Sequence, residues 1–342
     1  MAKKSKTTGP YAYISNSASS SITVIDTSTR QVVGSPIRVG GNPGGLSLTP
    51  KEEFLYVANG NPASHSVSVI DTSVNEVVAR IDVGLCPSTV AASADGNTIY
   101  AGLLDPNPYD KTLRMRDAVC AISTRTNKMI AMIDMSFGGM PVGNSDWPAP
   151  EGGCGGVGTL AMRPNRPHLY VPISNANKIA VIDTISNCVI KTFQAGSGPG
   201  LAFAPNALHF YEVCTYNLGL TVFDASDDSM VPNVSQDLGC QTPEVVAVTP
   251  DSGRLYVLCV DSHSLSVRDA TKPGFPVIGG GVQLPFQPSA LAFTPDCAYA
   301  YVLGGGDDAK VIVIETLHNT VFDTIKLPDG GPDGIVIGKK TH

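Results

Sequence analysis

The sequence has few charged residues, few aromatic residues and no long hydrophobic run. Of its 342 residues, 15% are charged and 6% are aromatic, and the net charge is −7. No window approaches the roughly 18 consecutive apolar residues of a membrane-spanning helix. The apolar fraction of 42% argues against an intrinsically disordered chain. Because the charge balance is acidic, neither nucleic acid nor a membrane is an expected partner.

Several catalytic and metal-binding motifs are also missing. The chain has no H-x-H, H-E-x-x-H or C-x-x-C spacing, so the common zinc signatures are absent. It has no G-x-S-x-G nucleophile elbow and no phosphate-binding loop with the required lysine. No nucleotide cofactor is therefore expected.

The N-terminal segment is basic, with Lys3, Lys4 and Lys6, but it lacks the apolar stretch of a secretory signal. Eight cysteines in a chain without that signal predict reduced thiols and a cytoplasmic location. Export remains the alternative if the chain is a processed form.

Glycine and proline are abundant, with 35 and 26 residues, and they separate the copies of a repeat. The segment S-I-T-V-I-D-T, which ends at Thr27, recurs in full or weaker form along the whole chain. Its acidic position falls at spacings of 45, 52, 60, 41, 45 and 46 residues. The seven copies place this position at Asp26, Asp71, Ser123, Asp183, Asp224, Asp269 and Glu315. A period near 45 residues is typical of β-propeller blades.

Each repeat contains four short strands separated by Pro, Asp, Asn and Gly. The chain starts on a second strand and finishes on a first strand, so residues 332–338 should complete the blade that residues 11–39 begin. The sequence therefore predicts an all-β, seven-bladed propeller of four-stranded antiparallel blades, closed by the C-terminal strand. This single domain spans residues 10–338, with tails at 1–9 and 339–342.

The repeat resembles YVTN-type β-propeller repeats. The matching segments are Y-V-A-N at Tyr56 to Asn59, V-S-V-I-D-T at Val67 to Thr72, and the proline-containing start of the first strand at Gly41 to Leu46. The resemblance covers nearly the whole chain except about 104–118 and 137–156. It implies the propeller fold and leaves the function open, because one fold supports many functions. Related propellers include lactonases and lyases, and the family includes cell-surface and periplasmic proteins.

Two repeated residue types are expected to be structural. The aspartate of V-I-D-T should accept hydrogen bonds from the backbone of the turn that follows it. Tyrosines that recur at one strand position should pack between blades, and they are Tyr13, Tyr56, Tyr100, Tyr170, Tyr256 and Tyr301.

The two long intervals of the repeat mark the strongest candidate site. Residues 104–118 and 137–156 are insertions predicted to lie side by side on one face of the ring, at the third blade. They carry an aromatic residue, arginines and carboxylates, which suit a polar or anionic ligand. The candidate ligand-binding residues are Asp110, Arg114, Arg116, Trp147, Glu151 and Cys154. The alternatives are a solvated loop or a lid for self-association.

A second candidate lies at the start of the first strands. Small residues follow the leading proline in four repeats, namely Gly44, Ser88, Gly200 and Ser289. Two repeats have Glu244 and Asp333 there instead, which makes these carboxylates the candidate catalytic residues at the channel mouth. They could act as general bases, hold a divalent cation as cofactor, or simply be hydrated.

Histidine and cysteine give weaker metal or nucleophile candidates. His65 and His263 occupy equivalent positions in two repeats, which repetition alone explains better than metal binding. Cys86, Cys154 and Cys240 precede first strands on the same face, but dispersed cysteines are usually buried hydrophobic residues.

The sequence therefore favours a small-molecule site on this face, with catalysis of the lactonase or lyase type as one form of it. The alternative is a non-catalytic scaffold that binds a protein partner through the same loops. DNA binding is the least favoured, because the chain is acidic and its basic residues are scattered.

Overall fold

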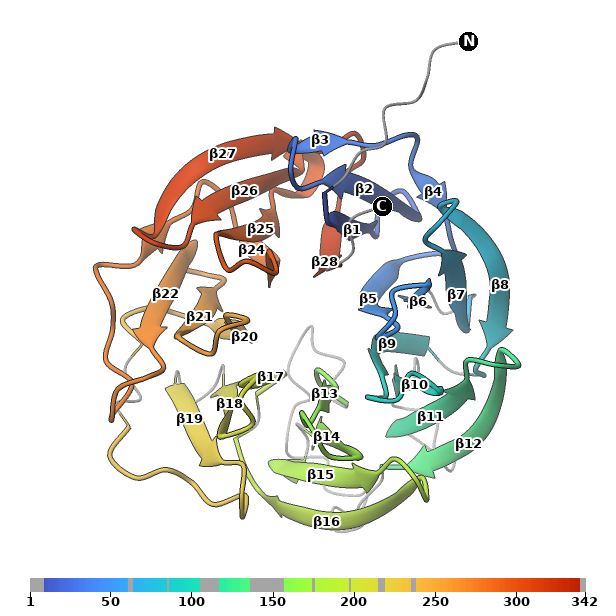
Figure 1. Ribbon diagram of the computed structural model, residues 1–342, viewed down its shortest axis with the longest axis horizontal. Helices are drawn as coiled ribbons and strands as arrows, with labels where there is room; N and C mark the ends of the chain where they lie inside the picture. The colour runs from blue at the N-terminus through green and yellow to red at the C-terminus, as the bar shows by residue number, and fades with distance from the viewer. Residues whose placement is uncertain are drawn as a thin grey trace, which may run out of the picture.

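The computed structural model describes residues 9–338, except 61–63, 85, 105–116, 136–156, 174–175, 197, 215–218 and 235–237. In this part of the chain, regular structure consists of 28 β-strands and one 3-10 helix, η2 (Gly306–Asp308). The strands form seven antiparallel sheets arranged in a ring around a common axis (Figure 1). The predicted all-β, seven-bladed propeller is confirmed.

The blades are numbered here along the chain, and their strands run from the axis outward. Blade 1 contains β28 (Pro332–Ile337), β1 (Tyr11–Asn16), β2 (Ser21–Asp26) and a divided outer strand, β3 (Gln31–Val32) with β4 (Ile37–Arg38). Blade 2 contains β5 (Pro43–Leu48), β6 (Phe54–Asn59), β7 (Ser66–Asp71) and β8 (Glu76–Asp82). Blade 3 contains β9 (Cys86–Ala92), β10 (Thr98–Leu104), β11 (Asp117–Ser123) and β12 (Lys128–Asp134). Blade 4 contains β13 (Ala161–Met162), β14 (His168–Ile173), β15 (Lys178–Asp183) and β16 (Cys188–Gln194).

The remaining blades follow the same order, but within the described residues the outer position is a single bridge in blade 5 and a two-residue strand in blade 6. Blade 5 contains β17 (Gly200–Phe203), β18 (His209–Cys214) and β19 (Gly219–Asp224), with Met230 bridging Phe223 at the outer position. Blade 6 contains β20 (Pro243–Val248), β21 (Arg254–Cys259), β22 (Ser264–Asp269) and β23 (Val282–Gln283). Blade 7 contains β24 (Pro288–Phe293), β25 (Tyr299–Gly304), β26 (Lys310–Glu315) and β27 (Thr320–Lys326).

The two ends of the chain meet in blade 1. Strand β28 pairs with β1 so that Ala12 lies opposite Ile337 and Tyr13 lies opposite Val336. The predicted closure by the C-terminal strand is therefore confirmed. Closing the ring in this way gives the inner edge of β1 a partner, which an open propeller would leave exposed.

The repeated tyrosines join neighbouring blades, as predicted, and they do so with a hydrogen bond as well as packing. Tyr56 is buried and its hydroxyl donates to Asn127 Oδ1 of blade 3 at 3.0 Å. Tyr100 does the same to Asn187 of blade 4 at 2.6 Å. These asparagines have positive φ angles of 51° and 55° in the turns before the outer strands. Asparagine tolerates that conformation better than most residues, so one side chain serves both the turn and the blade interface.

The aspartates of V-I-D-T hold turns, which confirms the second structural expectation. Asp71 Oδ1 accepts the backbone N–H of Ser73 at 2.9 Å and its hydroxyl at 2.6 Å. These hydrogen bonds lower the pKa of the Asp71 carboxyl. Asp183 accepts the N–H groups of Ile185 and Ser186 in the same way.

Candidate functional site

The innermost strands all begin at one end of the ring, which we call the top face. In each blade, the repeated tyrosine of the second strand lies opposite one residue of the innermost strand. We call the position three residues before that partner, on the innermost strand, the axial position. Pairing of the first and second strands places it at Gly44, Ser88, Gly158, Glu244, Ser289 and Asp333 in six of the blades. Glu244 and Asp333 are the two acidic residues of these six. The structure therefore assigns both predicted carboxylates to the same ring of positions.

In blade 5 the structure corrects the predicted alignment by one residue. Gly200 pairs with Val213 in the same way as Val245 pairs with Leu258 in blade 6, so blade 5 lacks the extra residue that holds the axial position in the other blades. A Cβ atom on Gly200 would lie 2.4 Å from the carbonyl oxygen of Glu244 in the next blade. Glycine is therefore required at residue 200 by the close approach of two innermost strands.

Asp333 lies beside a position that has no side chain. A Cβ atom on Gly44 of the neighbouring blade 2 would lie 3.4 Å from Asp333 Oδ2. The Asp333 side chain is exposed, yet the protein around it removes part of its hydration, and this desolvation raises the pKa of the carboxyl. A carboxylate with a raised pKa is a stronger base once it is ionised.

Glu244 is the second residue of the innermost strand of blade 6 and is also exposed. Desolvation raises the pKa of its carboxyl, and the nearby negative charge of Asp261 raises it further. Blade 7 separates Glu244 from Asp333, and the axial residue of that blade is Ser289, whose hydroxyl donates to the carbonyl of Pro332 at 3.0 Å. The order around the axis is therefore acid, hydroxyl, acid.

Metal binding finds little support in this arrangement. The described residues contain no group of three or more His, Cys, Asp and Glu side chains that could hold a metal ion. A calcium site usually takes six to eight oxygen ligands, and the axial ring supplies carboxylates at two positions.

The predicted ligand-binding residues of the two insertions, Asp110, Arg114, Arg116, Trp147, Glu151 and Cys154, lie outside the described residues. The structure does place the strand ends that flank these segments. Leu104 pairs with both Asp117 and Cys86 at the top face, and Val157 bridges Ile173 in blade 4. Residues 104 and 117 belong to β10 and β11, so the strands extend further into the first insertion than expected.

His65 and His263 have matching backbone roles. Their φ angles are 40° and 48°, and each carbonyl accepts a backbone N–H at the end of the same blade. The donors are Val83 at 2.8 Å and Leu284 at 2.7 Å. Ser20 and Asn177 occupy the same turn position in other blades, with φ angles of 53° and 51°. The equivalence of the two histidines thus follows from the turn.

The cysteines depart from the prediction in one pair. Cys240, in the segment that leads into blade 6, forms a disulfide with Cys259 at the end of β21, and their Cα atoms are 5.9 Å apart. The expectation of reduced thiols is wrong for this pair, because the fold brings together two residues that the sequence separates. Disulfides persist mainly in oxidising compartments, so the bond gives no support to a cytoplasmic location. Cys86 and Cys214 are buried.

Glu212 is a buried acid that no motif or repeat break of the sequence indicates. It has no exposed surface, and its counterparts in the other six blades are the buried apolar residues Ile14, Val57, Ala101, Val171, Val257 and Val302. Its Oε2 accepts the N–H of Gly196 at 2.7 Å, whereas Oε1 has no hydrogen-bond partner within the described structure. Burial raises the pKa of Glu212 to about 7. Comparing each strand position across the repeats would have revealed this substitution.

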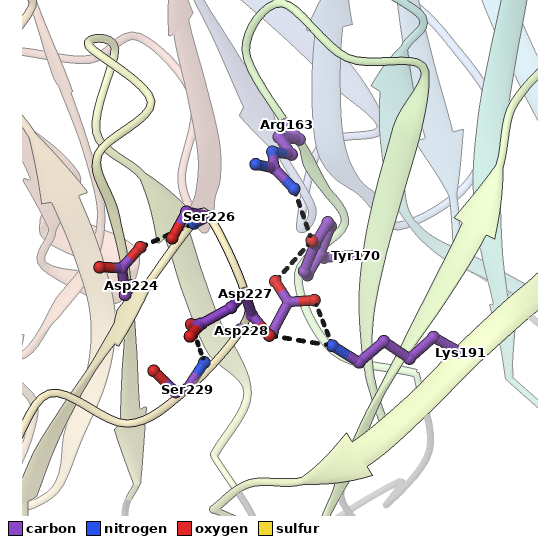
Figure 2. Close-up of polar contacts among 8 residues, drawn as sticks. All are labelled: Arg163, Tyr170, Lys191, Asp224, Ser226, Asp227, Asp228 and Ser229. Carbon is purple, nitrogen blue, oxygen red and sulfur yellow. Dashed lines mark hydrogen bonds and ion pairs between the residues drawn. The ribbon is translucent and has the colours of Figure 1, made fainter.

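A charged cluster occupies the opposite face, between blades 4 and 5. Figure 2 shows the Asp228 carboxylate between the Tyr170 hydroxyl, at 2.7 Å, and the Lys191 ammonium, at 2.8 Å. Arg163 donates to the same tyrosine hydroxyl at 3.4 Å. Asp228 occupies the place that asparagine has in other blades, as the partner of the repeated tyrosine. The cluster therefore joins two blades and lies away from the axial carboxylates.

Within the described residues, no helix is long and apolar enough to cross a membrane. Searches against protein-family models and against curated protein sequences find no match. The resemblance to YVTN-type repeats is therefore not confirmed at the level of the family.

Solved structures do match the chain over most of its length. The periplasmic gluconolactonase of Pseudomonas aeruginosa has a TM-score of 0.75 and 15% identity over 96% of this chain and 99% of that one. A structure described as a candidate 6-phosphogluconolactonase of Bacteroides uniformis has a TM-score of 0.75 and 13% identity over 96% of this chain and 99% of that one. Hydrazine synthase of Kuenenia stuttgartiensis has a TM-score of 0.65 and 19% identity over 92% of each chain. At these identities, the comparisons show that this chain shares its β-propeller fold with lactonases and with enzymes of other chemistry.

Proposed function

We propose that this protein is a lactonase-like hydrolase whose site lies at the top face, around the axial carboxylates. The observation that carries the proposal is the placement of Glu244 and Asp333 at equivalent positions of one ring, two blades apart, both with raised pKa. The structural similarity to a gluconolactonase and to a candidate 6-phosphogluconolactonase supports the reaction class.

In the proposed reaction, Asp333 is the general base, because Gly44 leaves room beside its carboxylate. The ionised carboxylate accepts a proton from water as the water oxygen bonds to the lactone carbonyl carbon. When the ring C–O bond breaks, the same carboxyl returns the proton to the departing oxygen. Lactone and water thus give a hydroxy acid, with no other reactant.

Glu244 is proposed to orient the substrate by accepting hydrogen bonds from its hydroxyl groups. The predicted loop residues Arg114, Arg116 and Trp147 are proposed to hold the polar part of the substrate from above. No step uses a metal ion, and measuring activity with and without EDTA tests that statement.

The test measures hydrolysis of a panel of lactones, some with ring hydroxyl groups and some without. Hydrolysis is monitored by the release of protons in a weakly buffered solution. Asp333→Asn should lower kcat by about 100-fold or more, as removal of a general base does. Glu244→Gln should mainly raise KM for the hydroxylated lactones. Glu76→Gln is the matched control, because Glu76 is exposed on the outer strand β8.

The proposal also predicts a pH profile. Because the base must be ionised, kcat should fall as the pH is lowered through the raised pKa of Asp333. Absence of hydrolysis across the panel, or full activity in Asp333→Asn, would refute the assignment.

A further inference from the structure

Blade 6 has a cavity on its outer side, away from the axial position. Its volume is about 450 Å³, within the roughly 300–1,000 Å³ of typical small-molecule sites. One wall is the segment Leu238 to Cys240, which leads into the blade. The other walls are β22, β23 and the glycine segment 279–281.

The cavity exists because the outer strand of this blade is interrupted. Outer strands of blades 2, 3, 4 and 7 have seven residues each, whereas β23 has two, which pair with Ser264 and Leu265. Val277 bridges Arg268 lower on the same strand, and the glycines connect the two paired parts. A Cβ atom on Gly279 or Gly280 would meet nothing within 4 Å, so the space beside this segment is open.

The opposite wall is fixed in place by three connections. The disulfide joins Cys240 to Cys259 of β21. The buried Ser266 hydroxyl donates to the carbonyl of Leu238 at 3.1 Å. The N–H of Gln241 donates to Ser262 Oγ at 3.1 Å. A wall held in this way loses little conformational freedom when a ligand binds.

The lining carries no charged side chain. Its polar groups are the hydroxyls of Ser262, Ser264 and Ser266, the Gln283 amide and the backbone of the glycines. Its apolar groups are Leu238, Leu265, Val277 and Val282. A charged ligand would lose hydration without gaining a counter-charge. The serine hydroxyls are hydrogen-bonded within the wall, Ser266 to the Leu238 carbonyl and Ser262 with Ser264 at 3.0 Å. A hydroxyl oxygen has two lone pairs, so these groups can still accept hydrogen bonds from ligand hydroxyls.

We propose that this cavity binds a small uncharged polyhydroxylated molecule, a monosaccharide or polyol. Such a ligand offers hydroxyl groups to the serines and C–H faces to the leucines and valines. The site is independent of the proposed hydrolase site, because it shares no residue with the axial ring.

The test measures binding of neutral monosaccharides and polyols by saturation-transfer NMR, with gluconate and glucosamine as charged analogues. Gly280→Leu should weaken binding of the neutral ligands at least tenfold by filling the cavity. The variant should fold, because Gly280 is not among the residues with positive φ and has open space beside it. Thr126→Leu is the matched control, since it adds the same side chain on an exposed turn of blade 3.

The outcomes separate this site from the axial one. Loss of binding in Gly280→Leu, with binding kept in Thr126→Leu and in Asp333→Asn, supports the cavity. Binding that survives Gly280→Leu but disappears in Asp333→Asn would overturn the proposal by placing the ligand at the axis. Equal binding of gluconate, or no binding of any neutral ligand, would also overturn it.

Discussion

Glu212 should make the stability of this protein depend on pH in an unusual direction. The side chain is fully buried, and burial raises its pKa from 4.5 to about 7, while the N–H groups of Gly196 and Gly198 act the other way but less strongly. The folded state therefore holds a proton that the unfolded chain releases near pH 4.5. The contribution of Glu212 to the unfolding free energy is therefore largest below that pH and is lost as the pH rises towards 7.

The size of the effect follows from the two pKa values. At about 1.36 kcal/mol for each pKa unit, the change from 4.5 to about 7 corresponds to a loss of about 3 kcal/mol of unfolding free energy. The loss is complete somewhat above pH 7, because there the carboxyl is ionised in both states. For a protein of marginal stability this is a large contribution from one residue.

The variant Glu212→Gln removes the titration and keeps an amide oxygen that can accept from Gly196. Urea unfolding of both proteins should give similar free energies at pH 5 and a difference of about 3 kcal/mol in favour of the variant at pH 8. Contributions from other titrating groups cancel in this difference, and Glu76→Gln controls for loss of one acidic residue. Parallel pH profiles for the wild type and Glu212→Gln would refute the reasoning.

Three further predictions concern the closure of the ring and the contacts between and within blades. Asp228→Ala removes the acceptor of the Tyr170 hydroxyl and should cost about 1–3 kcal/mol in urea unfolding, whereas Asp228→Asn restores the side chain of other blades and should cost less than half as much. Deleting residues 328–342 removes β28 and should abolish the cooperative thermal transition, which deletion of 339–342 should leave intact. Reducing the Cys240–Cys259 disulfide, which closes a loop of 19 residues, should lower the unfolding free energy by about 3 kcal/mol, and an unchanged denaturation midpoint in dithiothreitol would contradict this.

The axial acids show how far repeat comparison can go. Glu244 and Asp333 could be placed from the sequence because each follows a proline that starts a first strand, and strand pairing is regular across blades. The same comparison misplaced Gly200, because the first strand of blade 5 lacks the extra residue that causes a register shift after the proline in the other blades. A one-residue shift changes which side chain faces the axis, and cross-strand pairing decides it.

The fold itself was determined by local patterns in the sequence. Alternating apolar residues, turn residues and a period near 45 residues specify the strands and their number, because each repeat forms one blade that packs against its neighbours in the same way. The aspartates and tyrosines of the repeat could be assigned for the same reason.

Only the tertiary structure decided what depends on contacts between distant segments. The burial of Glu212 beneath the segment that leads into blade 5, the meeting of Cys240 with Cys259, and the cavity left by the interrupted outer strand of blade 6 are of this kind. Desolvation, bond formation and cavity shape depend on what surrounds a residue in space. A periodic sequence fixes the identity of each blade's own strands, while these surroundings arise only when seven unequal blades pack into one ring.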